Sequence, residues 1–263
     1  MTIQTFFRKL WQFGYIQALC CIFPVAVFAT LAISKFVHIP GLPRYDFILI
    51  VLILVQVAMV KFRLETLYEL KVILLFHIIG LVLEIFKVHM GSWSYPEFSY
   101  VRIADVPLYS GFMYASIGSY VVQAWKRFDL KTINWPSNWL SFPICVALYL
   151  NFFTEHFIPD LRYVIMLAVL IVFWRTKFQF KLVDHKHRMP AVLSFALIGF
   201  FIWVAEDIGT FLDAWRYPDQ VAAWRMVSVG KITSWLLLVI ISIVLVANLK
   251  HIKAKHKVKN QAV

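Results

Sequence analysis

The chain alternates long apolar runs with short polar segments. Eight of these runs have roughly the length and composition of a helix that crosses a bilayer, which takes about 20 apolar residues. Their approximate bounds are 16–37, 46–60, 70–89, 106–125, 139–157, 162–178, 190–211 and 229–249. The segments between them are short and leave no room for a soluble domain. The pattern predicts an all-α fold, a polytopic membrane helical bundle with about eight transmembrane helices in a single domain, 1–263.

The composition agrees with a chain whose solvent is lipid. Of the 263 residues, 61% are hydrophobic and only 15% are charged, whereas soluble domains carry about 25% charged residues. The mean hydropathy is +0.75. The first apolar run follows Arg8 and Lys9, as a signal peptide would, but it is long enough to span the membrane. We expect it to be kept as the first helix.

The basic residues are distributed unevenly between alternate loops. If the N-terminus is cytoplasmic, 18 Lys and Arg residues fall in inner segments and 8 in outer ones. This positive-inside bias predicts that both termini are cytoplasmic. The basic tail, 250–263, is expected to lie against anionic lipid headgroups. Although the net charge is +12, the basic residues lie between apolar runs and not on one soluble face, so we expect no nucleic-acid partner.

Two stretches of the chain resemble each other. Residues 76–97 and 195–219 both contain Phe, then Ile-Gly, an apolar turn, an acid, and a closing Trp-x-Tyr-Pro-acid motif. Four predicted helices separate the two motifs, so both lie on the outer side. The spacing suggests a parallel duplication with half-repeats 1–131 and 132–249. The alternative stays open that the similarity reflects only the preference of Trp and Tyr for membrane interfaces.

Acidic side chains occur at one depth on three helices that run outward. Glu84, Glu155 and Glu206 lie about 13–16 residues from the inner ends of their helices, or about 20–24 Å at roughly 1.5 Å per residue. They therefore form a layer in the outer third of the membrane. Ionisable groups inside a membrane usually face the bundle interior and often mark a functional site.

This layer leads to a hypothesis of acid–base chemistry. Crowded carboxylates in a low dielectric separate their pKa values, so that one can donate a proton while another accepts it. The catalytic candidates are Glu84, Glu155 and Glu206, with His77 as a proton relay. The candidates for substrate binding, several of them aromatic residues of a rim above the acids, are Asn151, Asp213, Trp93, Tyr95, Tyr109, Tyr114, Trp215 and Tyr217.

Two other interpretations of the acids stay open. One is structural, with ion pairs near the wet interface. The pairs would join Glu84 with Lys87, Glu155 with His156 or Arg162, and Asp213 with Arg216. The other is a pathway for a solute or a proton, along which the same acids bind a cation.

The sequence offers little for a metal or a cofactor. His77 and His89 are twelve residues apart, and His185-x-His187 beside Asp184 supplies only two imidazoles in a basic inner loop. Such sets fall short of a metal centre. No phosphate loop, Gly-rich dinucleotide turn or nucleophile elbow appears. We expect neither a metal nor a cofactor.

The fourth predicted helix has a recognisable start and a small face. Asp105, Val106 and Pro107 look like a helix N-terminus, with a capping acid and an early proline. Gly111, Ala115 and Gly118 then give a face that lets another helix approach closely. Plain packing is one interpretation, and room for a substrate beside Tyr109, Tyr114 and Tyr120 is the other.

Three segments carry a resemblance to a known family. Residues 84–97, 106–130 and 205–220 resemble the bacterial membrane-protein family catalogued as domain of unknown function 817, and the similarity extends over nearly the whole chain. The resemblance implies a multi-pass protein of the bacterial inner membrane, and it transfers no catalytic residue.

A fainter similarity joins about 30 residues to membrane carotenoid hydratases and small lycopene cyclases. The matching positions would be Glu84, Gly91, Trp93, Tyr95 and Pro107. This resemblance implies proton-driven chemistry on an isoprenoid double bond, with Glu84 or Glu206 as the acid.

The sequence thus favours a membrane-embedded acid–base enzyme or binding protein for a lipophilic molecule, with isoprenoids as a candidate class. The alternatives are a small-solute or proton-coupled transporter and a non-catalytic scaffold. The expected partners are the lipid bilayer and the lipophilic molecule.

Overall fold

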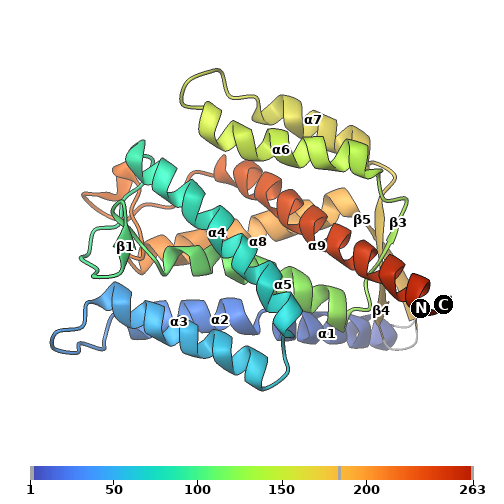
Figure 1. The fold of residues 1–263 in the computed structure, drawn as a ribbon, viewed down its shortest axis with the longest axis horizontal. Coiled ribbons are helices and arrows are strands. Elements are labelled where there is room, and N and C mark those ends of the chain that lie inside the picture. Colours follow the sequence, from blue (N-terminus) through green and yellow to red (C-terminus); the bar gives the residue numbers. More distant parts are fainter. Residues whose placement is uncertain (1–2, 183–184, 262–263) are drawn as a thin grey trace.

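The structure, a computed structural model, describes residues 3–182 and 185–261, with side chains described through residue 248. It is a mostly helical bundle (Figure 1), which confirms the predicted membrane helical fold. The helices are α1 (Ile3–Cys20), α2 (Ile22–Ile33), α3 (Arg44–Lys61), α4 (Leu67–His89), α5 (Ser110–Arg127), α6 (Asn138–Thr154), α7 (Arg162–Phe173), α8 (Ala191–Phe211) and α9 (Lys231–Gln261), with a 3-10 turn η1 (Pro218–Gln220). The strands are β1 (Arg102–Ile103), β2 (Val106–Pro107), β3 (Lys131–Ile133), β4 (Lys177–Leu182) and β5 (His185–Pro190).

Each of the eight predicted segments contains a helix, but the helices differ in length. Within the described residues, three helices are long and apolar enough to cross a membrane, namely α4, α8 and the part of α9 at Lys231–Asn248. Helices α1 and α2 meet at a bend of 63° and would add a fourth span if they cross together. Helices α6 and α7 are apolar but shorter. Eight crossings therefore stay a prediction.

The start of the fourth predicted helix is different from the expectation. Asp105 does not cap a helix, because it lies in the turn of a small hairpin with φ +64°, beside Ala104 at +47°. Strands β1 and β2 form this hairpin by pairing antiparallel. Two central residues with positive φ give the turn a twist that matches the strands. Helix α5 begins only at Ser110.

A three-stranded antiparallel sheet, which the sequence analysis did not predict, closes one end of the bundle. Its order is β3-β4-β5. The sixth helix was predicted to extend to residue 178, but α7 ends at Phe173 and the chain enters strand β4 at Lys177. Figure 1 places both termini at this same end. An even number of crossings requires that arrangement. Which side of the membrane this end faces stays a prediction.

Helix α4 has well-defined ends. A capping box fixes its start, with Thr66 Oγ1 accepting from the Glu69 amide at 3.2 Å and the Glu69 carboxylate accepting from the Thr66 amide at 2.9 Å. Its end turns at Gly91, with φ +70°, a conformation that glycine adopts without a steric penalty. These caps place Glu84 five residues, or about one and a half turns, before the end of the helix.

Helix α5 is central, with most of its residues buried. Its small face packs closely on α4. A Cβ added at Gly118 would lie 2.5 Å from the Phe76 ring, and one at Gly111 would lie 2.7 Å from the His77 ring. This geometry supports the packing interpretation of the small face. Large apolar side chains such as Leu54, Ile171 and Phe201 point outward and are more than half exposed, as expected for surfaces in contact with lipid.

Candidate functional site

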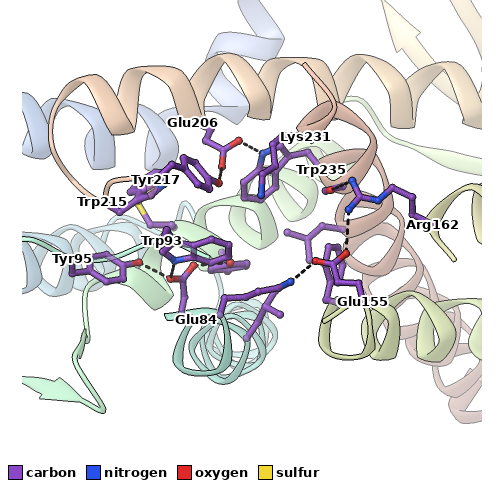
Figure 2. A pocket seen from close by; sticks show the side chains of 17 residues that line it. Glu84, Trp93, Tyr95, Glu155, Arg162, Glu206, Trp215, Tyr217, Lys231 and Trp235 are labelled. Carbon is purple, nitrogen blue, oxygen red and sulfur yellow. Dashed lines mark hydrogen bonds and ion pairs between the residues drawn. The ribbon is translucent and has the colours of Figure 1, made fainter. Parts of the chain in front are cut away.

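A cavity of about 90 Å³ lies where the C-terminal ends of α4, α6 and α8 meet the first turns of α7 and α9. Figure 2 shows it from close by. Its charged lining residues are Glu84, Lys87, Glu155, Arg162, Glu206 and Lys231. Its aromatic lining residues are Trp93, Tyr95, Tyr114, Phe152, Trp215, Tyr217 and Trp235. The three acids predicted to form one layer thus line one cavity.

Two corresponding segments build this cavity. We call residues 84–96 the first Glu–Trp–Tyr element and residues 206–218 the second. In each, a Trp follows the acid by nine residues, a Tyr by eleven and a Pro by twelve. The helix ends in the same way in both, because Gly91 and Asp213, seven residues after the acids, adopt positive φ values of 70° and 56°.

The hydrogen bonds of these two helix ends also correspond. The Ser92 amide donates to the Lys87 carbonyl at 2.9 Å, and the Ala214 amide donates to the Gly209 carbonyl at 3.0 Å. This is the bond that closes a helix with a left-handed residue. The same turn geometry therefore carries each Trp and Tyr back toward the acid on its own helix.

Glu84 is buried and accepts hydrogen bonds from three neutral donors. Trp93 Nε1 and the Tyr95 hydroxyl donate to Oε2, each at 2.7 Å, and the Tyr114 hydroxyl of α5 donates to Oε1 at 2.7 Å. Burial, and then the Glu84 carboxylate, raise the pKa of Tyr95 well above its usual value. The Tyr95 hydroxyl therefore keeps its proton and serves as a donor.

Glu206 is held in a similar way by two donors. The Tyr217 hydroxyl donates to Oε1, and Trp235 Nε1 of α9 donates to Oε2 at 2.5 Å. Burial, and then the Glu206 carboxylate, raise the pKa of Tyr217 well above its usual value. Its hydroxyl, like that of Tyr95, remains a donor.

The two elements touch each other at one pair of backbone groups. Ser94 and Arg216 form an antiparallel bridge in which each amide donates to the other carbonyl at 2.9 Å. Both residues are tenth after their acids. Since equivalent residues pair with each other, the contact has local two-fold symmetry. The rings of Trp93 and Tyr217 also meet edge to face, with centroids 5.9 Å apart.

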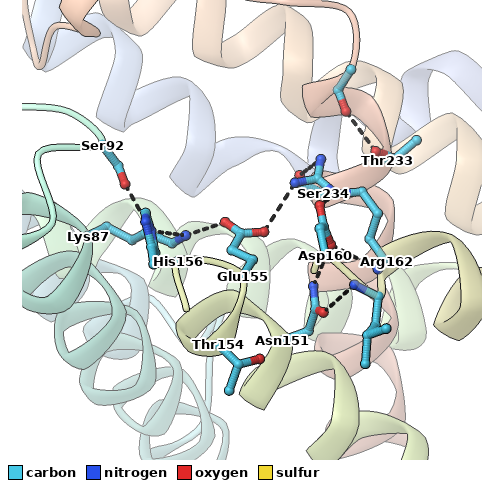
Figure 3. Close-up of polar contacts among 12 residues, drawn as sticks. Lys87, Ser92, Asn151, Thr154, Glu155, His156, Asp160, Arg162, Thr233 and Ser234 are labelled. Carbon is cyan, nitrogen blue, oxygen red and sulfur yellow. Dashed lines mark hydrogen bonds and ion pairs between the residues drawn. The ribbon is translucent and has the colours of Figure 1, made fainter. Parts of the chain in front are cut away.

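Glu155 belongs to a separate ionic network, shown in Figure 3. The Lys87 ammonium donates to Glu155 Oε1 and also to His156 Nε2, which is 3.0 Å away. Arg162 donates to Glu155 Oε2 at 3.1 Å and to the Ser234 hydroxyl at 3.1 Å. The network thus joins α4, α6, α7 and α9 at one side of the cavity.

Lys231, the first residue of α9, points its ammonium at aromatic rings. Nζ lies 4.8 Å from the centroid of Tyr217 and 5.6 Å from that of Trp93. The two rings come from the two different Glu–Trp–Tyr elements. Such cation–π contacts are stronger when the cation is removed from water.

Asp213 lies at the edge of this region and makes ion pairs. Its carboxylate lies 2.7 Å from Lys35 Nζ and 2.7 Å from Arg216 Nε. The hydrogen bond from Arg216, and then the hydrogen bond from Lys35, lower the pKa of Asp213 to about 2. Arg44 also donates to the Asp213 carbonyl at 3.2 Å, and it pairs with Glu97 at 2.5 Å.

Several predicted site residues are thus part of the cavity. Besides the three acids, they are Trp93, Tyr95, Tyr114, Trp215 and Tyr217. The expected pairing of Glu84 with Lys87 is wrong, because Lys87 turns to Glu155. Those of Glu155 with Arg162 and of Asp213 with Arg216 are present.

Four predicted residues lie outside the cavity lining. His77 packs edge to face on Phe112, with ring centroids 4.7 Å apart, and its Nδ1 is buried without a hydrogen-bond partner in the described part of the chain. Asn151 ties the α6–α7 loop through Asp160 and the Leu161 amide, each at 3.0 Å. Tyr109 donates to the Ala214 carbonyl, and Asp213 makes the ion pairs above. These four side chains contact other protein groups and are not part of the cavity lining, and their predicted roles stay predictions.

Sequence analysis did not assign five polar residues of the lining to the site, namely Lys87, Arg162, Lys231, Ser234 and Trp235. It considered Lys87 and Arg162 only as ion-pair partners of the acids. The sequence does contain a pattern that indicates this site. When Glu84 is aligned with Glu206, instead of one Ile-Gly pair with the other, the spacing to Trp, Tyr and Pro is identical in both elements. That alignment shows that the cavity has two corresponding walls.

The histidine pair considered for a metal does not gain support. His185 and His187 lie on β5, and Asp184 lies outside the described residues. Across residues 3–182 and 185–261, no group of three or more His, Cys, Asp or Glu side chains is placed to hold a metal ion.

Comparison with known proteins gives a family and a fold neighbour. The model of the family described as "Protein of unknown function (DUF817)" matches residues 9–243. "Uncharacterized protein YoaT" of Bacillus subtilis (strain 168) is 53% identical over 252 residues, covering 96% of each chain. The crystal structure of MvINS, a mycobacterial Insig homolog from Mycobacterium vanbaalenii, matches with a TM-score of 0.48 and 13% identity, over 68% of this chain and 92% of that one.

Proposed function

This chain belongs to the DUF817 family, and we propose that it is a multi-pass protein of the bacterial inner membrane that binds an amphiphilic molecule from the bilayer. The polar end of the molecule occupies the cavity between the two Glu–Trp–Tyr elements. Its apolar chain lies along the helix surfaces that face lipid.

The observation that carries this proposal is a group of charged side chains in one small cavity within an apolar bundle. Six charged side chains line it, although burying charge is costly in a membrane unless it serves binding or structure. Aromatic rings surround these charges. A few polar groups among apolar walls are the usual make-up of a small-molecule site.

The size of the cavity limits what it can hold. A volume of about 90 Å³ suits a small polar head, whereas sites for whole drug-sized ligands are about 300–1,000 Å³. A long hydrocarbon chain must therefore remain outside. Exposed apolar side chains on α6, α7 and α8, such as Leu150, Leu167 and Phe201, supply surfaces for it.

Acid–base catalysis on the bound molecule is the second candidate function. Two buried carboxylates line the cavity with different numbers of donors, three on Glu84 and two on Glu206. Different environments of this kind separate the proton affinities of two acids. Binding is favoured over catalysis because both oxygens of both carboxylates already accept hydrogen bonds from the protein.

Lipid extraction tests the binding proposal. The protein would be purified in a mild detergent, and co-purifying molecules would be extracted and identified by mass spectrometry. We expect one class of amphiphile to be enriched with the wild type and depleted with Ser234→Trp, which fills the cavity. Val229→Trp is the matched control, because Val229 is exposed and lies five residues away.

The result also separates the alternatives. Equal amounts of every lipid with the wild type and Ser234→Trp would contradict binding in the cavity and favour a scaffold. A bound molecule that is chemically altered by the wild type, but not by Glu206→Gln, would establish catalysis. Flux of a solute or protons into proteoliposomes that depends on Glu84 would indicate a transporter.

A further inference from the structure

We propose that the cavity receives an oxyanion, a phosphate or a carboxylate, and that Lys231 is its principal donor. This inference rests on the proposed function and specifies the chemical class of the polar head. Its basis is which lining groups already have partners and which one remains free.

The cavity lining has equal numbers of acidic and basic side chains, so counting them does not decide whether the ligand is positively or negatively charged. Three acids and three bases line the cavity. The acids all accept hydrogen bonds from protein donors. Glu84 accepts three, Glu206 accepts two, and Glu155 accepts from Lys87 and Arg162.

Two of the three bases are also occupied. Lys87 donates to Glu155 and His156. Arg162 donates to Glu155, Ser234 and Asp160. Their charges still act on the cavity, but most of their donors are directed at protein oxygens and nitrogens.

Lys231 differs from these two bases. Its ammonium carries three N–H donors, yet its side chain donates no hydrogen bond and makes no ion pair within the described residues. The rings of Tyr217 and Trp93 interact with it. Rings attract the positive charge but do not replace a hydrogen-bond acceptor. The unused hydrogen-bonding capacity of the cavity is therefore donor capacity, centred on Nζ.

A charged acceptor fits this position better than a neutral one. An ammonium withdrawn from water is costly unless it is paired and hydrogen-bonded. Hydrogen bonds between an ammonium and a carboxylate or phosphate are about twice as strong as those between neutral groups. The nearby charges of Lys87 and Arg162 also favour a negative ligand. A carboxylate or phosphate head is small enough for the cavity.

Binding measurements with matched pairs of ligands test the inference. The purified full-length protein in neutral detergent would be titrated with oleate against oleyl alcohol, and with phosphatidic acid against diacylglycerol. Inorganic phosphate is the arm that represents a free anion. Native mass spectrometry and thermal stabilisation are the two readouts.

We expect oleate or phosphatidic acid to bind at least tenfold more tightly than its neutral counterpart. Lys231→Gln should remove this preference, and Lys231→Arg should keep part of it. Arg225→Gln is the matched control, because Arg225 is an exposed cation in the loop before α9, outside the cavity lining. It should leave the preference unchanged.

The outcomes distinguish this inference from the proposed function. Equal binding of charged and neutral amphiphiles would overturn the oxyanion and leave amphiphile binding intact. Binding of inorganic phosphate without any amphiphile would support the oxyanion and contradict the proposed function. No binding in any arm would overturn both. If Lys231→Gln does not fold, the wild-type preference for anionic over neutral ligands still decides.

Discussion

The two Glu–Trp–Tyr elements have the same backbone conformation at their helix ends, but their side chains make different contacts. In the first, Trp93 of the turn donates to Glu84. In the second, a Cβ on Gly209 would lie 2.5 Å from the Trp215 ring, so this Trp lies against its own helix. The donor to Glu206 then comes from Trp235 on the next helix.

The residue three positions after each acid accounts for part of this difference. In the first element it is Lys87, which pairs with Glu155 just after the end of α6. In the second it is Gly209, which leaves room for Trp215. Descent of both elements from one duplicated segment stays a prediction. In the structure, the first wall is the ionic side of the cavity, and the second is more aromatic.

Replacing Glu84 or Glu206 should have the largest effect on the free energy of unfolding, and the size of the loss should differ between the two walls. Glu84→Leu leaves one buried and two partly buried donors without an acceptor, whereas Glu206→Leu leaves one of each. A buried orphaned donor costs about 1–3 kcal/mol, and a partly buried one, which water can reach, costs about 1 kcal/mol. We expect losses in unfolding free energy of roughly 3–5 kcal/mol for Glu84→Leu and roughly 2–4 kcal/mol for Glu206→Leu, measured by equilibrium unfolding in mixed micelles with Trp fluorescence.

Glu84→Gln is the control for this comparison, because the amide oxygen still accepts hydrogen bonds. Its loss should lie between wild type and Glu84→Leu. A larger loss for Glu206→Leu than for Glu84→Leu would show that the number of donors does not set the stability of each wall.

Gly80→Ala should disturb the first wall alone. A Cβ at Gly80 would lie 2.2–2.5 Å from Cγ, Cδ2 and Cβ of Tyr114, and Tyr114 cannot move without leaving Glu84. Overpacking of this kind costs about 1–3 kcal/mol. The control is Gly14→Ala, because no atom lies within 4 Å of a Cβ added there. If the loss were unchanged in a Tyr114→Phe background, the clash would not act through the bond to Glu84.

The helix ends offer a comparison with a smaller effect. Gly91→Ala introduces a Cβ at φ +70° with no neighbour within 4 Å, so its cost is purely conformational, about 1 kcal/mol. Asp213→Gly relaxes φ +56° but loses two partly exposed ion pairs, each worth about 0–1 kcal/mol. We expect its net effect to be near zero in thermal unfolding. A loss larger than that of Gly91→Ala would mean that the ion pairs dominate the second turn.

The sequence was informative where periodicity and helix depth are decisive. Apolar run length predicted the helical segments, and position along the outward helices predicted that Glu84, Glu155 and Glu206 would lie together. Both quantities follow from the rise of a helix and the thickness of a bilayer. Residue counting is sufficient for them.

The remaining parts depend on contacts that residue counting does not capture. Lys87 lies one turn from Glu84 on the same helix, yet it pairs with Glu155 because three neutral donors already surround Glu84. His77 shares a face with Glu84 but meets the α5 backbone at Gly111. Asp105 was expected to cap a helix because of the proline that follows closely, but pairing of Val106 and Pro107 with β1 delays the helix to Ser110.

Protonation of Asp213 should give the smallest effect and one specific to the second turn. Its pKa is lowered from 3.8 to about 2, chiefly by the hydrogen bond from Arg216. A lowered folded-state pKa contributes stability that is present above about pH 4 and is lost as the pH falls toward 2. Because the side chain is 31% exposed, we expect this contribution to be at most about 1 kcal/mol.

The control is Asp213→Asn, since Asn also tolerates positive φ but does not titrate. The difference in unfolding free energy between wild type and Asp213→Asn should be constant above pH 4 and shrink below it. A constant difference down to pH 2 would show that the ion pairs of Asp213 do not stabilise the turn. Asp213 would then resemble Gly91 only in its positive φ value.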